Sequence, residues 1–125
     1  MKYKLTARKN PQQPQCPPKL YAAPVNDGKV SQEEIAVEIV ALSSLARGDV
    51  ANVIDSTIDT IPKYLLMGKS VNLGDLGTFR ISFSSEGVDT ADEFNVSMIS
   101  GVKIIFTPSV KLKKQIEDIR FEKGE

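Results

Sequence analysis

The chain has 125 residues and a mass of 13.7 kDa, and 41% of its residues are hydrophobic while 26% are charged. This length accommodates one modest hydrophobic core, and no apolar run approaches the roughly 18 residues of a membrane helix. The sequence contains no histidine, which excludes Ser-His and Cys-His nucleophilic pairs and imidazole ligands for zinc. We therefore expect a single domain that is not an enzyme and that binds neither a metal nor another cofactor.

The sixteen basic and sixteen acidic residues cancel, but they are distributed unevenly along the chain. The net charge is +5 over residues 1–30, −5 over residues 31–60, −2 over residues 61–100 and +2 over residues 101–125. Since no net field attracts the protein to phosphate, any binding to nucleic acid must depend on local basic clusters.

The first 30 residues have the character of β-strands. Residues 3–8 alternate apolar and polar side chains, and residues 19–25 resume an extended pattern after a proline-rich loop. We therefore expect a β extension in front of the main fold. The N-terminus lacks the apolar stretch of a secretory signal, and the single cysteine, Cys16, has no partner for a disulfide. These features predict a cytoplasmic protein.

Two helices are predicted next. Ser31 and Glu34 have the spacing of a capping box, and the apolar residues that follow recur at helical spacing over residues 32–43. A second amphipathic helix begins near Arg47 and ends at Gly68, where a left-handed cap fits. The broad apolar face of this second helix consists of Val50, Val53, Ile54, Ile58, Ile61, Leu65 and Leu66.

The pattern changes to strands from residue 70 onward. The strand material of residues 71–84 is interrupted by Gly74 and Gly77, which predicts a tight turn between two short strands. A turn-rich segment then precedes further strand material over residues 94–106. We therefore expect a long hairpin over about residues 80–106.

A final short helix is predicted after Pro108. It contains the basic cluster Lys111, Lys113 and Lys114, which lies beside the end of the hairpin and suits contacts with phosphate. A solvated helix face, balanced by the carboxylates that follow, is equally compatible with this composition.

The order of these segments resembles the HU and integration host factor family over about residues 31–121. The residues that resemble the family's strand-turn-strand signature and the start of its last helix are Val71, Leu73, Leu76, Gly77, Thr78, Phe79, Phe106, Pro108, Leu112 and Lys113. Within the family, the chain is most similar to the HU-related histone-like proteins of Bacteroidetes-type bacteria, through its N-terminal extension and the segment Ser84 to Gly87.

This resemblance implies an α+β fold of the HU/IHF type, with a two-helix base, a sheet saddle with a long β-hairpin arm, and a short C-terminal helix. It divides the chain into an N-terminal β extension (1–30), an HU-like DNA-binding domain (31–121) and a C-terminal tail (122–125). It also implies an intertwined homodimer. A physical reason supports the dimer, because one short chain cannot bury the whole apolar face of the second helix.

The function implied by the resemblance is architectural. We expect a non-enzymatic, histone-like protein of the bacterial nucleoid that binds double-stranded DNA with little sequence specificity. The expected partners are duplex DNA and a second copy of the chain, with no membrane and no small-molecule substrate. The candidate DNA-binding residues are Arg80, Lys103, Lys111, Lys113 and Lys114.

A departure from the family leaves a second hypothesis open. Arms of the family are basic and insert a proline between base pairs, whereas residues 82–101 of this chain include no lysine or arginine. The acidic residues of this segment are Glu86, Asp89, Asp92 and Glu93. The alternative is therefore an HU-fold protein-interaction module that has lost DNA binding because its arm is acidic, and that binds a protein through edge pairing.

Overall fold

The computed structural model describes residues 1–124, which form two compact units. The first unit combines residues 1–35 with the C-terminal residues from Asp118 onward, and the second comprises residues 36–117. The predicted extension (1–30) lies within the first unit, and the described part of the predicted tail, residues 122–124, belongs to the same unit. The reason is that the C-terminal segment pairs with the first strand of the chain.

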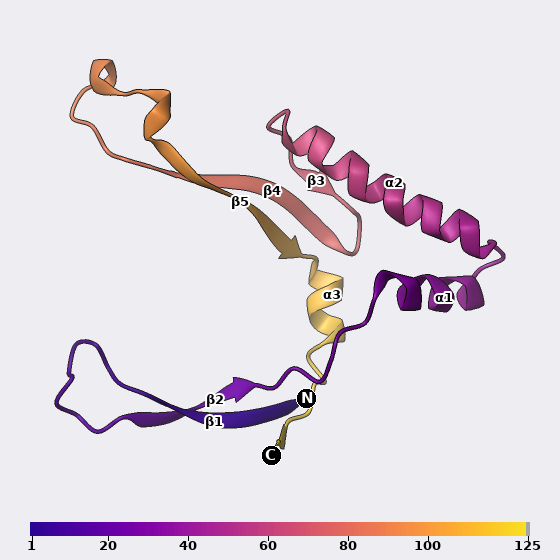
Figure 1. Ribbon diagram of the computed structural model, residues 1–125, viewed down its shortest axis with the longest axis horizontal. Coiled ribbons are helices and arrows are strands. Elements are labelled where there is room, and N and C mark those ends of the chain that lie inside the picture. The colour runs from indigo at the N-terminus through magenta and orange to yellow at the C-terminus, as the bar shows by residue number, and fades with distance from the viewer. Residues whose placement is uncertain (125) are drawn as a thin grey trace. The chain divides into compact units, whose positions relative to one another are not determined.

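The first unit contains a three-stranded sheet in the order β2-β1-β6, of which Figure 1 labels β1 and β2. β1 (Lys2–Arg8) and β2 (Lys19–Pro24) are antiparallel, and β6 (Glu122–Lys123) is parallel to β1. The amide of Gly124 donates a hydrogen bond to the carbonyl of Tyr3 at 2.8 Å. Both strands predicted for the N-terminal extension are therefore present, and the C-terminal strand completes their sheet.

Two helices follow in chain order. α1 (Gln32–Leu42) begins at Ser31, whose hydroxyl oxygen accepts a hydrogen bond from the amide of Glu34 at 3.2 Å and donates one to the Glu34 carboxylate at 3.3 Å. The predicted helix start at Ser31 is thus confirmed, but the Glu34 carboxylate accepts from the Ser31 hydroxyl and not from the Ser31 amide, so only the Ser31 half of a capping box is present. α2 (Arg47–Leu65) has no such start, since Ala46 offers no side chain to cap it.

The end of α2 is well defined. Gly68 has a φ of +79°, and its amide donates to the carbonyl of Leu65 at 3.0 Å. The amide of Lys69 reaches back to the carbonyl of Tyr64 at 3.2 Å, which completes a Schellman motif. The left-handed cap predicted at Gly68 is therefore confirmed.

The second unit contains an antiparallel sheet in the order β3-β4-β5. Its strands are β3 (Val71–Asn72), β4 (Gly77–Ser85) and β5 (Ile99–Pro108), and the last two form a long hairpin (Figure 1). The tight turn predicted between the first two strands is present, because the Asn72 side chain accepts a hydrogen bond from the amide of Gly74 at 2.9 Å. Gly74 adopts a φ of +60°, which favours glycine.

The distal end of the hairpin differs from the prediction. Residues 94–98 were expected to be strand, but the segment between β4 and β5 contains the 3₁₀ turns η1 (Ala91–Glu93) and η2 (Val96–Met98). Asn95 is responsible, because its side chain accepts a hydrogen bond from the amide of Ser97 at 3.0 Å and its carbonyl accepts one from the amide of Met98 at 2.9 Å. These local bonds replace strand pairing, so β5 begins only at Ile99.

Few side chains are buried within the part of the chain that the structure describes. The buried hydrophobic residues there are Ala36, Val50 and Leu65, all in the second unit. Val53 and Ile58 of α2 are 60% and 53% exposed. The predicted apolar face of α2 is therefore only partly covered within one chain. No helix within residues 1–124 has the length and apolarity needed to span a membrane.

Candidate nucleic-acid interface

The hairpin brings two of the five predicted DNA-binding residues together. Arg80 in β4 is opposite Ile105, and Lys103 in β5 is opposite Ser82. Directly opposed residues of an antiparallel pair project to the same side, and alternate residues of a strand share a face. Arg80 and Lys103 are therefore diagonal neighbours on one face of the hairpin.

The opposite face of the hairpin is apolar. Phe79 is paired with Phe106, and their ring centroids are 4.9 Å apart with the rings tilted by 46°. Ile81 is paired with Ile104, and Ile104 is 59% exposed. The hairpin thus has one face on which two cations lie beside Ile105, and an opposite apolar face that the described chain leaves partly exposed.

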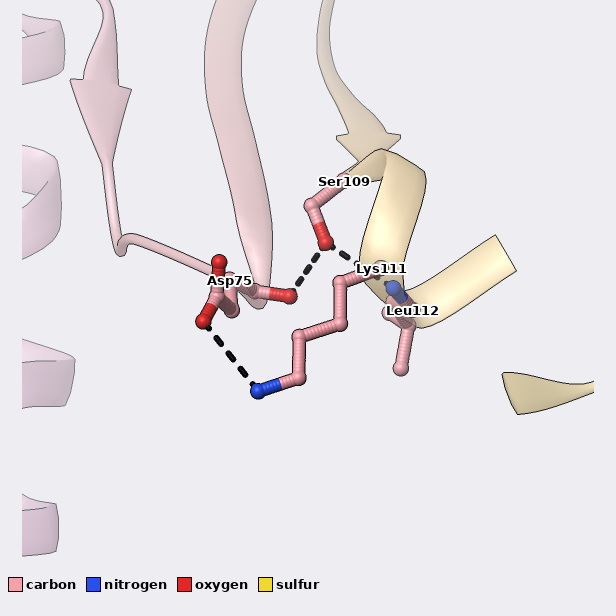
Figure 2. A network of polar contacts seen from close by, with 4 residues as sticks. All are labelled: Asp75, Ser109, Lys111 and Leu112. Carbon is pink, nitrogen blue, oxygen red and sulfur yellow. Dashed lines mark hydrogen bonds and ion pairs between the residues drawn. The ribbon is translucent and has the colours of Figure 1, made fainter. Parts of the chain in front are cut away.

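The start of helix α3 (Val110–Gln115) is anchored by contacts of Ser109 and Lys111 with Asp75 (Figure 2). The Ser109 hydroxyl accepts a hydrogen bond from the amide of Leu112 at 3.0 Å and donates one to the carbonyl of Asp75, in the turn between β3 and β4. The side-chain amine of Lys111 lies 3.4 Å from the Asp75 carboxylate. The β3–β4 turn therefore fixes the start of α3 through both the backbone and the side chain of Asp75.

The structure places the three predicted lysines of α3 in different surroundings. Lys111 and Lys114 line one shallow depression together with Asp75, whereas Lys113 is not part of its wall. The side chains of Lys111 and Asp75 are 65% and 77% exposed. An ion pair this exposed contributes only about 0–1 kcal/mol, so a phosphate can replace the carboxylate at little cost.

The acidic residues noted in the sequence lie at the distal end of the hairpin. Glu86, Asp89, Asp92 and Glu93 follow β4 and extend through η1, and all four are exposed. Within residues 1–124, no group of three or more acidic or cysteine side chains is arranged to hold a metal ion. The carboxylates of this segment therefore define a negatively charged tip with no metal-binding arrangement.

Two helices, an antiparallel hairpin with two cations on one face, and a capped helix after the hairpin define a small α+β protein of the HU type. A family model described as "HU domain fused to wHTH, Ig, or Glycine-rich motif" matches residues 1–123. The chain therefore belongs to the HU-HIG family, and the resemblance found in the sequence is confirmed, as is the α+β, HU-like fold at a coarse level.

The chain is also similar to a solved structure from Bacteroides vulgatus named "Putative bacterial DNA binding protein". The identity is 20% and the TM-score is 0.61, with 97% of this chain and 47% of that chain covered. This chain thus spans about half the length of the Bacteroides protein, and the likeness concerns the fold. No curated protein matches the sequence.

Proposed function

We propose that this protein is a non-enzymatic, histone-like architectural protein that binds double-stranded DNA with little sequence specificity. The observation that best supports this is the common face of Arg80 and Lys103 on the hairpin of an HU-family chain. Cations arranged along an extended ribbon can contact phosphates without reading base edges. Such binding suits a cytoplasmic protein of the bacterial nucleoid.

The proposed assembly is a homodimer. Its support is the amount of apolar surface that one chain leaves open on α2 and on the hairpin, where Ile58 and Ile104 are both more than half exposed. Burial of apolar surface is the main favourable term in association. A second copy that covers both surfaces would give each chain the core that it lacks alone.

The lysines of α3 are proposed as further phosphate contacts. Lys113 and Lys114 lie in the last turn of α3, where cations also interact favourably with the helix dipole. Lys111 would exchange its exposed partner Asp75 for a phosphate oxygen. The capped and anchored start of α3 fixes the backbone from which these side chains extend, which lowers the entropic cost of binding.

Paired substitutions on the hairpin test this function. R80Q/K103Q removes both cations of one face, and K63Q/K69Q is the matched control, because it removes two lysines of the same unit that flank the Tyr64 ring. Affinity for a random-sequence duplex is measured by fluorescence anisotropy between about 50 and about 200 mM salt. The first variant should reduce the slope of log K against log salt by about 1.8 for each protomer that contacts DNA. An equal change in this slope for R80Q/K103Q and K63Q/K69Q would contradict the proposal.

A second candidate function is favoured by the acidic tip of the hairpin. Four exposed carboxylates there would be repelled by DNA, so the same fold could instead serve as a protein-interaction module. Absence of binding to any duplex at low salt, in a folded and dimeric preparation, would support this candidate over the first.

A further inference from the structure

We infer that the first unit has a phosphate-binding site of its own, formed by Arg8, Lys9, Lys19 and Tyr21 where β1 and β2 enter their connecting loop, and that this site contacts the backbone of duplex DNA. The inference rests on the proposed function for the identity of the ligand. It adds a contact surface that includes none of the five candidate residues of the second unit.

The register of β1 and β2 concentrates positive charge at this end of the sheet. Arg8 is directly opposite Lys19, and Tyr21 shares their face. Like charges in directly opposed positions destabilise a strand pair. No ion pair formed among residues 1–124 neutralises either cation. An anion between the two side chains would turn this local repulsion into attraction, and breaches of local rules of this kind tend to mark functional positions.

A concavity of about 590 Å³ lies at the same place. Arg8, Lys9, Lys19 and Tyr21 line it together with polar residues of the loop, and none of its lining residues is acidic. The guanidinium carbon of Arg8 lies 6.0 Å from the centre of the Tyr21 ring, at the limit of a cation–π contact. The planar fork of Arg8 is suited to bidentate hydrogen bonds with phosphate.

The loop that closes the concavity is ordered by its own hydrogen bonds. The Asn10 side chain accepts one from the amide of Gln12 at 3.0 Å, and the Asn10 carbonyl accepts one from the amide of Gln13 at 3.1 Å. The amide of Cys16 donates in turn to the carbonyl of Gln13 at 3.1 Å. The backbone is further restricted by Pro11, Pro14, Pro17 and Pro18. A wall arranged in advance reduces the ordering cost of binding.

The distribution of charge favours a polyanion as the ligand. Residues 1–30 have a net charge of +5. The nearest acidic residue in the sheet register is Glu122, which pairs in β6 with Lys2 at the opposite end of β1 from Arg8. The three cations of the concavity are therefore left to a ligand from outside the chain, and a row of phosphates matches them better than a single small anion.

Cys16 provides a direct test, because it lines the concavity, is exposed and is the single cysteine of the sequence. The rate of its modification by uncharged N-ethylmaleimide is measured with and without a saturating random-sequence duplex. We expect bound duplex to slow the reaction severalfold. An unchanged rate with the duplex demonstrably bound would overturn the inference. Protection by inorganic phosphate at equal ionic strength, but not by duplex, would assign the site to a small phosphorylated ligand and would also overturn it.

Charge variants test the same site by a second route. R8Q/K19Q removes the opposed cations, and K29Q/K123Q is a matched control that removes two lysines of the same unit outside the concavity. R8Q/K19Q should make the slope of log K against log salt shallower by about 1.8 for each such site that contacts DNA, whereas K29Q/K123Q should leave the slope unchanged. Thermal melts establish folding; R8Q/K19Q removes both the repulsion between the opposed cations and the Arg8–Tyr21 contact, so its melting temperature should stay close to that of the wild type.

The outcomes separate this inference from the proposed function. If the wild type binds no DNA, both are wrong. If R80Q/K103Q lowers the slope while R8Q/K19Q behaves like its control, the inference alone is wrong. A loss of self-association in R8Q/K19Q, with DNA binding unchanged, would assign the basic face to a protein contact and likewise overturn the inference.

Discussion

Replacement of Gly77 by alanine should strongly destabilise the hairpin. Gly77 has a φ of +149°, and a Cβ there would overlap the carbonyl oxygen of Thr107 and lie 2.8 Å from the ring of Phe106. Both neighbours belong to β5, and Gly77 is itself paired with Pro108, so relief of the overlap would disturb the strand register. Backbone strain of this kind costs about 1–3 kcal/mol, and overpacking adds about 1–3 kcal/mol. We therefore expect a loss of about 2–6 kcal/mol in the free energy of unfolding.

Two other glycines provide graded controls for Gly77→Ala. Gly74 has a φ of +60° but open space around it, so Gly74→Ala should cost only the backbone strain, about 1–2 kcal/mol. Gly87 has neither a positive φ nor a close neighbour, so Gly87→Ala should change stability by less than about 0.5 kcal/mol. The assay is urea unfolding followed by circular dichroism at one fixed protein concentration, because dimerisation affects stability. If Gly77→Ala unfolds at the same urea concentration as Gly87→Ala, the β4–β5 register is wrong.

Three further predictions concern α3, the dimer and the hairpin tip. Ser109→Ala removes the cap of α3 and its bond to Asp75, and should lower the free energy of unfolding by about 1 kcal/mol in urea unfolding; no change would mean that the cap is unimportant. Ile58→Ala should weaken dimerisation by about 2 kcal/mol in sedimentation of a dilution series, and a wild type that sediments as a stable folded monomer would refute the dimer. Replacement of the acidic tip by lysine should strengthen DNA binding in a gel shift if the hairpin approaches the duplex, and unchanged affinity would show that the tip points away. The tip residues replaced are Glu86, Asp89, Asp92 and Glu93.

The helix ends that could be predicted from the sequence depend on interactions between residues that are close together in the chain. The start of α1 depends on the bond from the Glu34 amide to the Ser31 hydroxyl, and the end of α2 depends on Gly68, so a short window of sequence suffices for each. The start of β5 was misplaced because strand-forming residues surround Asn95, whose side chain forms a turn instead. Strand propensity depends on context, and a single Asn can override it.

The geometry of the candidate site required the tertiary structure. A common face for Arg80 and Lys103 follows only from the register of β4 and β5, since a slip of one residue would place them on opposite faces. The pairing of Lys111 with Asp75 joins residues 36 positions apart, and no local pattern signals it. The parallel pairing of β6 with β1 joins the two ends of the chain, which is why residues 122–125 resembled a tail in the sequence. The sequence therefore shows which residues are basic but not which of them share a face of the fold.

The central claim is tested most directly by the salt dependence of wild-type binding to random-sequence duplexes. If the five candidate cations of a protomer each neutralise one phosphate, log K should fall linearly with log salt with a slope of about −4.5 for each protomer that contacts DNA, and duplexes of different sequence should give the same line. A folded protein that binds no duplex at low salt, or whose affinity does not change with salt, would contradict the account.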